Sequence, residues 1–187
     1  VQNSWYRAAV TCRMYAEMDG GNATSWRYRL CTPSLVYNLL KTLRSIQFPH
    51  SLPKSELEKI ATGAMADDHE NIESALETYY QFGDIKVDQN FRNGSVPVFY
   101  WRAVGNSFNG FFIEGFVDEM AHKAGIDPLA FRLKHLDPKK NAYKVTKLVA
   151  EKANWGSTEP GRFKGIAFEY IKEAYVGMVT EVSVDND

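Results

Sequence analysis

Residues 96–136 read VPVFYWRAVGNSFNGFFIEGFVDEMAHKAGIDPLAFRLKHL, and this stretch decides the fold of the 187-residue chain. Its apolar residues recur at helical spacing over 108–124 and cover a face wide enough to imply burial on more than one side. Asn106 or Ser107 can cap the start of such a helix, and Gly125 stands where a left-handed residue ends one. The pattern therefore predicts a long helix that is buried on several sides.

Three more helices and one short helical segment are expected. Asp127 and Pro128 supply a cap and a first-turn proline for a helix that ends at about Leu136. After Ser34, apolar residues at helical intervals predict a helix that ends before Pro49. The third helix is expected over 143–154, and the short helical segment over 73–80.

An alternating pattern predicts a β-hairpin near the N-terminus. Apolar residues occupy the even positions over 10–18, Gly-Gly-Asn at 20–22 breaks the run, and 25–32 resumes it. One register gives a continuous apolar face and sets Glu17 opposite Arg27 on the other face. Its apolar pairs are Met14 with Leu30, Ala16 with Tyr28 and Met18 with Trp26.

The two cysteines, Cys12 and Cys31, point to opposite faces of this hairpin in the favoured register. We therefore expect two free thiols, whereas a disulfide would require a pairing slipped by one residue. Neither cysteine has the spacing of a metal ligand, and the four histidines are scattered. The sequence predicts no metal site formed by its own residues.

A second hairpin is expected from 85–91, a turn at Asn93-Gly94, and an almost continuous apolar run over 96–101. Strands are also expected at 165–171 and 175–184, and a long loop over 50–71. The sum is an α+β fold, with two hairpins and further strands packed with about four helices. We treat 1–187 as one unit, with possible sub-parts 1–48, 49–72 and 73–187.

The composition excludes several classes of function. Apolar residues make up 44% of the chain and charged residues 24%, as in a folded globular protein. A net charge of −1 leaves no surplus of cations for phosphates, which disfavours a nucleic-acid module built on the WRYR motif at 26–29. No apolar run approaches the roughly 20 residues needed to cross a bilayer. We expect a soluble protein, cytoplasmic or periplasmic, and both ends read as cuts within a longer chain.

Chemistry is most strongly indicated at 100–107, where Arg102 is expected to leave a buried strand and enter a helix through a tight turn. Free backbone amides at a helix start attract negative charge, and a guanidinium beside them adds donors that stay protonated. This geometry would form a site for an anion or an oxo group. The alternative is that Arg102 only pairs with Glu114 or with a backbone carbonyl.

A long ordered series of motifs resembles the isoquinoline 1-oxidoreductase type of molybdenum hydroxylase, and more distantly the xanthine dehydrogenases and aldehyde oxidases. The series consists of WYRAAV at 5–10, WRAVGNS at 101–107, GFFIEGFVDEMA at 110–121, GIDPLAFR at 125–132 and GRFKGIA at 161–167. It covers nearly the whole chain and is strongest over 96–136. The resemblance implies part of a molybdenum-cofactor-binding domain in the large subunit of such an enzyme.

The resemblance also implies an activity and a set of site residues. These enzymes hydroxylate a carbon beside nitrogen, or an aldehyde, with oxygen taken from water at a molybdenum centre. The molybdopterin cofactor would be lined by Trp101, Arg102, Ala103 and Gly105. Substrate would contact Val104, which replaces an aromatic residue, together with Phe168 and Glu169. For Phe168, the alternative is an ordinary place in the core of a strand.

The chain departs from the family in two respects. IKE at 171–173 replaces a small and aromatic segment, which leaves the substrate class open. The family's catalytic glutamate and its second glycine-rich cofactor loop lie beyond residue 187, so no catalytic residue is assigned. We therefore expect no activity and no bound cofactor from this chain alone.

The expected partners are the remainder of the large subunit, a small subunit carrying 2Fe-2S clusters, and a small-molecule substrate. In the competing hypothesis the chain is a non-catalytic interaction domain, whose aromatic helix and hairpin only dock another protein of the complex. The fragment hypothesis predicts exposed apolar area where other parts of the large subunit pack, whereas an independent domain would have a polar surface.

Overall fold

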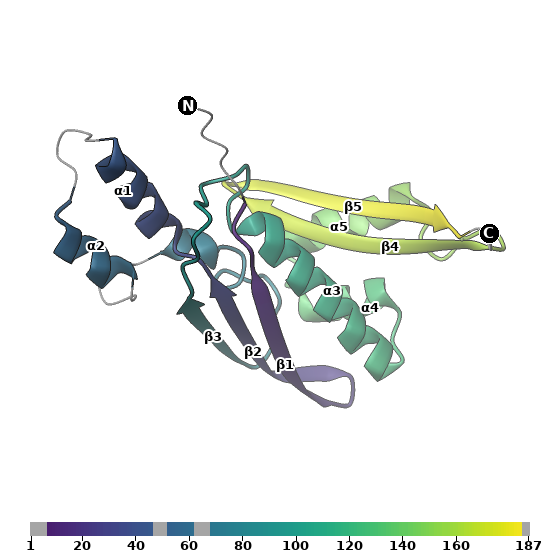
Figure 1. Cartoon of the computed structure of the whole chain (residues 1–187). Helices are drawn as coiled ribbons and strands as arrows, with labels where there is room; N and C mark the ends of the chain where they lie inside the picture. The colour runs from purple at the N-terminus through teal and green to yellow at the C-terminus, as the bar shows by residue number, and fades with distance from the viewer. Residues whose placement is uncertain (1–6, 47–51, 62–67, 185–187) are drawn as a thin grey trace.

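A computed structural model describes residues 7–46, 52–61 and 68–184 of the chain. Helices and strands occur in separate runs, which confirms the α+β class (Figure 1). The strands are β1 (Thr11–Asp19), β2 (Asn22–Thr32), β3 (Asp84–Phe91), β4 (Arg162–Ile171) and β5 (Ala174–Ser183). The helices are α1 (Leu35–Ser45), α2 (Lys54–Ala61), α3 (Asn106–Ala124), α4 (Pro128–His135) and α5 (Asn141–Lys152), with a short 3-10 turn at His69–Asn71.

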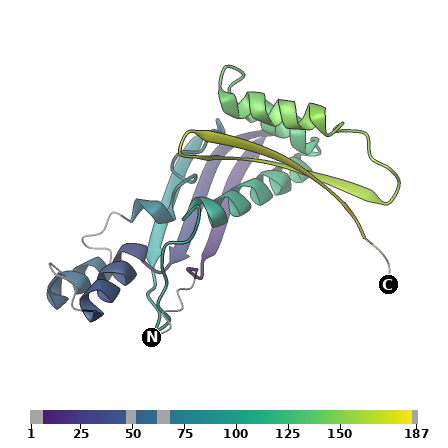
Figure 2. The same ribbon diagram turned by 90° about the horizontal axis from the view of Figure 1, so that it is seen from above.

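Two small sheets flank the long helix α3. Strands β1, β2 and β3 form one sheet in that order, and β4 pairs with β5 in a separate antiparallel hairpin. The hairpin runs between α3 and α5, and α5 covers its far face (Figure 2). Helix α3 therefore lies between the two sheets and contacts β1, β4 and α4.

The core lies between the first sheet and α3, because alternate residues of β2 point toward the helix. Trp26, Tyr28 and Leu30 are each at most 2% exposed. The Trp26 ring stacks on Phe82 at 4.8 Å and meets the edge of Phe116 at 5.4 Å. Burial of these large aromatic rings favours docking of α3 on the sheet.

The N-terminal hairpin forms, but the predicted register is wrong by two residues. Met14 lies opposite Tyr28 and Ala16 opposite Trp26, with an irregularity between Glu17 and Met18. Glu17 faces Ser25 instead of Arg27. A slip of two residues preserves the buried face, so the predicted apolar face is still correct.

The turn explains the difference in register. Gly20 and Gly21 both have positive φ angles, 53° and 78°, and Asp19 pairs directly with Asn22. Two such residues make a two-residue turn, which is tighter than the loop assumed from the sequence. Cys12 and Cys31 lie on opposite faces of the hairpin and are both free, as expected.

The predicted second hairpin is wrong. Strand β3 pairs in parallel with β2, and 96–101 is not a strand. Pro97 lacks the N–H group that a ladder needs, which disfavours a regular strand in this run. The parallel pair instead requires a long crossover. That crossover runs from Thr32 to Asp84 and contains α1 and α2.

Three smaller expectations are also corrected. The expected loop over 50–71 contains α2 within its described part, and the short helix expected at 73–80 is a series of turns. The N-cap of α3 is Gly105, without a side-chain cap, rather than Asn106 or Ser107. The expected end at Gly125 is confirmed, since its φ is 67°, and the Asp127 cap of α4 is confirmed by its bond to the Ala130 amide.

His135 joins α4 to the turn of the first hairpin as a neutral imidazole. The Ala23 amide donates to its Nε2 at 3.1 Å, and its Nδ1–H donates to the Phe131 carbonyl at 2.9 Å. Burial lowers the pKa of His135 from its usual 6.5, and nearby Lys134 lowers it further, while the Phe131 carbonyl opposes the change. Protonation would remove the acceptor for the Ala23 amide.

We predict that stability falls in mild acid because of this histidine. The folded pKa lies below the unfolded value, so the stabilisation is complete above about pH 6.5 and is lost as pH falls through the folded pKa. Between about pH 7 and 5, the free energy of unfolding should fall by roughly 1–2 kcal/mol. Urea titrations of wild type and His135→Gln, compared across this range, would measure the effect. Equal pH dependence in both proteins would refute it.

Candidate functional site

The turn over 101–105 leads directly into α3. The Val104 amide donates to the Trp101 carbonyl at 2.8 Å, and the Ser107 hydroxyl donates to the Val104 carbonyl at 2.8 Å. Ala103 and Val104 have φ angles of 65° and 40°, which are unusual for residues with a Cβ atom. Backbone strain of this kind is often found at binding sites.

Arg102 projects from this turn into solvent. Its side chain is exposed, and no hydrogen bond or ion pair holds it among the described residues. It does not leave a buried strand as expected, and it does not pair with Glu114. Its neighbour Ala103 lines the large groove described below, whereas Arg102 itself does not.

The start of α3 does not offer the free amides that were expected. Gly105 is packed so closely under the Glu70 carbonyl that an added Cβ would lie 2.1 Å from that oxygen. The Glu73 carboxylate accepts from Asn106 Nδ2 at 2.8 Å. Burial raises the pKa of Glu73, and the Gly105 amide acts against that rise. A carboxylate of the protein thus occupies the place predicted for an external anion.

A wide apolar groove lies between α3 and the β4–β5 hairpin. Its volume is about 660 Å³. On the hairpin side it is lined by the face that points away from α5, and on the other side by residues of α3 near Gly110 and Gly115. Phe111, at the rim, is 76% exposed. The groove is therefore an open, apolar surface feature large enough for a small ring compound.

Two of the predicted substrate residues, Phe168 and Glu169, line this groove. Phe168 is buried, and its ring meets the edges of Tyr79 and Tyr80 at 6.2 and 5.5 Å. It therefore also belongs to the core, as the alternative interpretation held. Its aromatic contacts fix the position of β4 against the 79–80 segment.

Glu169 is anchored through one carboxylate oxygen. Its Oε1 accepts from the Ser74 hydroxyl at 2.7 Å and from the Tyr170 amide at 3.0 Å. Ser74 itself has a left-handed φ of 66° and also contacts Asn106 Oδ1. The other oxygen, Oε2, lies over Gly110, where an added Cβ would be 2.0 Å away. Burial raises the pKa of Glu169 above its usual value.

The other predicted site residues lie elsewhere. Trp101 and Val104 line a separate small hollow of about 20 Å³, and the Arg7 guanidinium lies over the Trp101 ring at 5.3 Å. Gly105 is buried. The structure thus brings together Ala103, Phe168 and Glu169 and separates them from the remaining four predicted residues.

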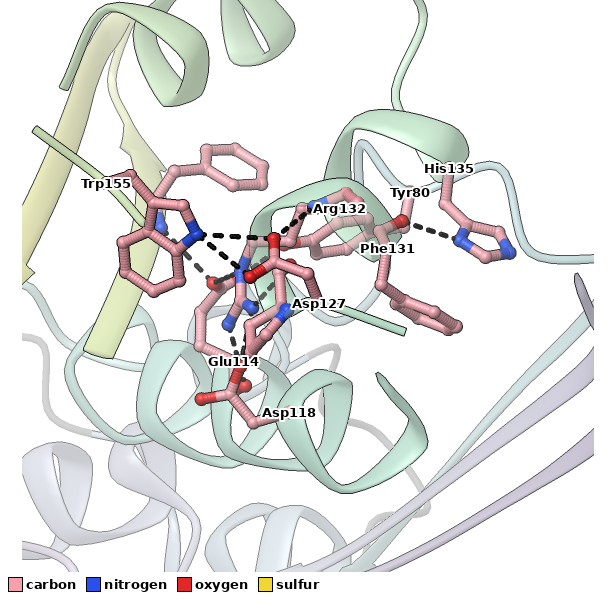
Figure 3. A network of polar contacts seen from close by, with 11 residues as sticks. Tyr80, Glu114, Asp118, Asp127, Phe131, Arg132, His135 and Trp155 are labelled. Carbon is pink, nitrogen blue, oxygen red and sulfur yellow. Dashed lines mark hydrogen bonds and ion pairs between the residues drawn. The ribbon is translucent and has the colours of Figure 1, made fainter. Parts of the chain in front are cut away.

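Beneath the groove lies a buried ion-pair network (Figure 3). Arg132, from α4, is 0% exposed, and its Nε donates to Glu114 Oε2 at 2.9 Å. Its Nη1 donates to Asp118 Oδ1 at 2.5 Å, and its Nη2 to the Glu114 carbonyl at 3.1 Å. Tyr80 Oη donates to Glu114 Oε1 at 2.7 Å, and the Phe168 amide donates to Glu114 Oε2 at 3.2 Å.

This network joins three segments that are distant in sequence. Glu114 on α3 is bonded to α4 through Arg132 and to β4 through Phe168. Burial raises the pKa of Glu114, while Arg132 and the hydrogen bonds from Tyr80 and Phe168 oppose the rise. The network therefore sets the distance between α3 and β4, which are the two walls of the groove.

The residues described in 7–46, 52–61 and 68–184 contain no group of three or more metal-ligating side chains that could hold an ion. Of the four histidines, His50 lies outside the described residues. Within the described ranges, no helix combines the length and apolar character needed to cross a membrane.

Comparison with known proteins shows what the chain resembles. It is 32% identical over 101 residues to the beta subunit of isoquinoline 1-oxidoreductase from Brevundimonas diminuta, a match that covers 52% of the chain and 13% of that protein. It is 38% identical over 125 residues to a subunit of nicotinate dehydrogenase from Pseudomonas putida, a match that covers 57% of the chain and 10% of that protein. No family model matches.

Solved structures share the fold. Quinoline 2-oxidoreductase from Pseudomonas putida 86 superposes with a TM-score of 0.55 at 16% identity, over 86% of the chain and 21% of that structure's chain. Aldehyde oxidoreductase from Desulfovibrio gigas superposes with a TM-score of 0.51 at 16% identity, over 90% of the chain and 18% of that structure's chain. The chain resembles part of a molybdenum hydroxylase large subunit.

The resemblance predicted from the motifs is thereby confirmed. The chain spans only about a tenth of the length of the curated molybdenum hydroxylase relatives that it matches. The sequence interpretation missed Arg132 and Asp118, and its alternative pairing of Arg102 with Glu114 is not found. A signal was present: Glu114 and Asp118 are four residues apart in the most apolar helix, so one buried cation must lie near that face.

Proposed function

We propose that the chain forms one wall of the substrate pocket in a molybdenum hydroxylase. The parent enzyme would hydroxylate an N-heterocycle or an aldehyde with oxygen from water. The observation that supports this most is the apolar groove, because the predicted substrate residues Phe168 and Glu169 both line it and Ala103 lies at its border. Sites for small aromatic molecules are commonly concave and apolar with a few polar groups.

The described residues do not by themselves fit a molybdopterin cofactor. That cofactor is a phosphorylated pterin, whereas the groove has no cationic side chain among its described lining residues. At the start of α3, Glu73 occupies the neighbourhood of the Gly105 amide. Arg102 is the one predicted cofactor residue that offers a charged donor, and it has no ion-pair partner in the described part of the chain. We propose that other parts of the large subunit hold the cofactor and that Arg102 lies at its edge.

In this proposal the chain binds and orients substrate but supplies no catalytic base. Val176 and Met178 offer apolar surface to a ring and exclude water from one side of it. Glu169 offers a single polar contact. The chain alone would therefore be inactive, because proton transfer to or from the reacting group would depend on a residue outside it.

Exposed apolar side chains support packing against further protein. Five of the eight large apolar residues that are at least half exposed among the described residues lie on α3 or on the hairpin and the residue after it: Phe111, Phe163, Val176, Met178 and Val184. We propose that the remainder of the large subunit covers part of this surface, and that a 2Fe-2S protein completes the enzyme. The competing docking-domain hypothesis would leave the groove filled by a partner rather than by substrate.

The proposal predicts that Arg102→Ala lowers turnover in the intact enzyme. Loss of a charge-assisted contact at the active centre should reduce kcat/KM on the order of tenfold to a hundredfold. Steady-state kinetics with the enzyme's own heterocyclic substrate would measure this. Arg92→Ala is the matched control, since Arg92 is also exposed and its side chain donates to the Phe91 carbonyl, away from the groove. Unchanged turnover in Arg102→Ala would contradict the proposed place of Arg102.

A further inference from the structure

A row of four polar side chains joins the start of α3 to the groove. At one end, Asn106 Nδ2 donates to Glu73 Oε2 at 2.8 Å. The Ser74 hydroxyl contacts Asn106 Oδ1, and on its other side it lies 2.7 Å from Glu169 Oε1. The row therefore runs Glu73, Asn106, Ser74, Glu169, with a carboxyl group at each end.

This row has one hydrogen too few if both carboxyl groups are ionised. The Ser74 oxygen faces two acceptors, Asn106 Oδ1 and Glu169 Oε1, but a hydroxyl group carries a single proton. If that proton points to one acceptor, the other contact is left as two oxygen atoms with no hydrogen between them. Such a contact is unfavourable in a partly buried place, where water cannot relieve it.

Turning the Asn106 amide over does not remove the deficit. Its nitrogen would then donate to Ser74, and Ser74 would donate to Glu169, but Asn106 Oδ1 would face the carboxylate of Glu73. Each orientation satisfies all three contacts only when one carboxyl group is protonated. The proton lies on Glu169 in the first orientation and on Glu73 in the second.

The surroundings of Glu73 favour its charged form. The Lys172 ammonium attracts the charge of this carboxylate, and the Gly105 amide donates to it. Glu70 and Glu77 repel it. A cation and a backbone donor thus stand at this end of the row.

Glu169 has no comparable support on the groove side. The groove is lined by two further carboxylates, Glu114 and Asp118, and by no lysine, arginine or histidine among the described residues. Arg132 lies beneath it but is fully buried and bonded to both of those carboxylates. A charged Glu169 would therefore add an unpaired negative charge to an apolar groove, which is costly.

The opposite side of Glu169 holds tyrosines. Tyr79, Tyr80 and Tyr170 line a small hollow there, which Glu77 also lines, and no cationic side chain does so in the described part of the chain. Burial raises the pKa of Tyr79 and of Tyr80, so both phenols are neutral. The Tyr170 amide donates to Glu169 Oε1 at 3.0 Å, and a protonated oxygen keeps a lone pair for this bond.

We propose that this row binds a single proton at neutral pH, and that the proton lies on Glu169 Oε1 and is donated to Ser74 Oγ. The Ser74 hydroxyl then donates to Asn106, whose amide nitrogen donates to an ionised Glu73. The groove therefore meets a neutral carboxyl group, and the negative charge lies at the start of α3. Burial raises the pKa of both Glu73 and Glu169, which agrees with one retained proton. This inference does not depend on the proposed function.

Carbon-13 NMR of the glutamate carboxyl carbons in the full chain would show both protonation states. Loss of a signal in Glu73→Gln and in Glu169→Gln identifies the two carbons. At neutral pH, the Glu169 carbon should have the chemical shift of a carboxylic acid and the Glu73 carbon that of a carboxylate. Two ionised groups, or a proton on Glu73 instead, would overturn the inference.

Ser74→Gly tests the direction of the hydrogen bond between Ser74 and Glu169. Ser74 has a φ of 66°, which glycine adopts readily, so the substitution removes the hydroxyl at little cost to the backbone. Because Ser74 accepts the proton of Glu169 in the proposed row, its loss should lower the proton affinity of Glu169 on the order of tenfold. A hydroxyl that donated to an ionised Glu169 would give the opposite sign, and a rise in proton affinity would overturn the inference.

Ser107→Ala is the matched control. Its hydroxyl also lies beside the groove, but it donates to the Val104 carbonyl rather than to this row. The proton affinity of Glu169 should be unchanged in this variant, and a fall as large as in Ser74→Gly would overturn the assigned role of Ser74. The spectrum of the wild-type chain decides where the proton lies even if Ser74→Gly does not fold.

Discussion

Replacement of Arg132 by methionine is expected to lower the free energy of unfolding by about 3–5 kcal/mol, because it leaves the Glu114 carboxylate buried without its cation. Arg132 is fully buried and bonds to Glu114, to Asp118 and to the Pro128 carbonyl. Methionine has a similar length, so the loss would come mainly from charge and hydrogen bonding rather than from a cavity. Urea unfolding followed by circular dichroism would measure it.

Two comparisons make this result specific to the buried pair. Arg162→Met removes an exposed arginine that pairs with Glu181, and it should cost less than about 1 kcal/mol. Adding Glu114→Gln to Arg132→Met removes the unpaired charge, so the double variant should recover at least half of the loss. A loss in Arg132→Met no greater than in Arg162→Met would show that the network does not stabilise the fold.

Asn109→Leu is expected to lower the free energy of unfolding by about 3 kcal/mol, because it leaves several buried polar groups without partners. Asn109 is fully buried on α3, and its Nδ2 donates to the Asn71 and Glu73 carbonyls at 2.9 and 2.7 Å. Its Oδ1 accepts from Tyr28 Oη at 2.5 Å. One side chain thus fastens the 71–73 segment and β2 to the same helix.

The control for Asn109→Leu is Asn141→Leu. Asn141 is exposed at the start of α5, so its replacement should lower the free energy of unfolding by less than about 1 kcal/mol. Adding Tyr28→Phe to Asn109→Leu removes one of the unpaired groups and should recover part of the loss. A midpoint of denaturation for Asn109→Leu equal to that of Asn141→Leu would contradict the assigned role.

Local signals predicted the helices better than the strand pairings. Gly125 and the Asp127-Pro128 pair act within a few residues of their own positions, so the end of α3 and the start of α4 could be located from the sequence. The partner of β3 depends on the long crossover from Thr32 to Asp84, and no local pattern specifies it. The hairpin register depended on whether Gly20 and Gly21 alone make the turn.

The site could be predicted only in part for a similar reason. Phe168 and Glu169 were found through the family resemblance, and they do line the groove. The groove itself forms between α3 and a hairpin that comes much later in the chain, so its size and charge were not visible in the sequence. The alternative interpretation of Arg102 paired it with Glu114 or with a backbone carbonyl, whereas the charged partner of Glu114 is Arg132.

The most direct test of the central proposal is a crystal structure of the intact, molybdenum-loaded enzyme with a bound heterocyclic substrate. The proposal predicts that the ring lies in the groove, in contact with Met178 and with its nitrogen edge at Glu169. A substrate bound elsewhere, with another part of the protein filling the space between α3 and β4–β5, would contradict it and would favour a docking role for this surface.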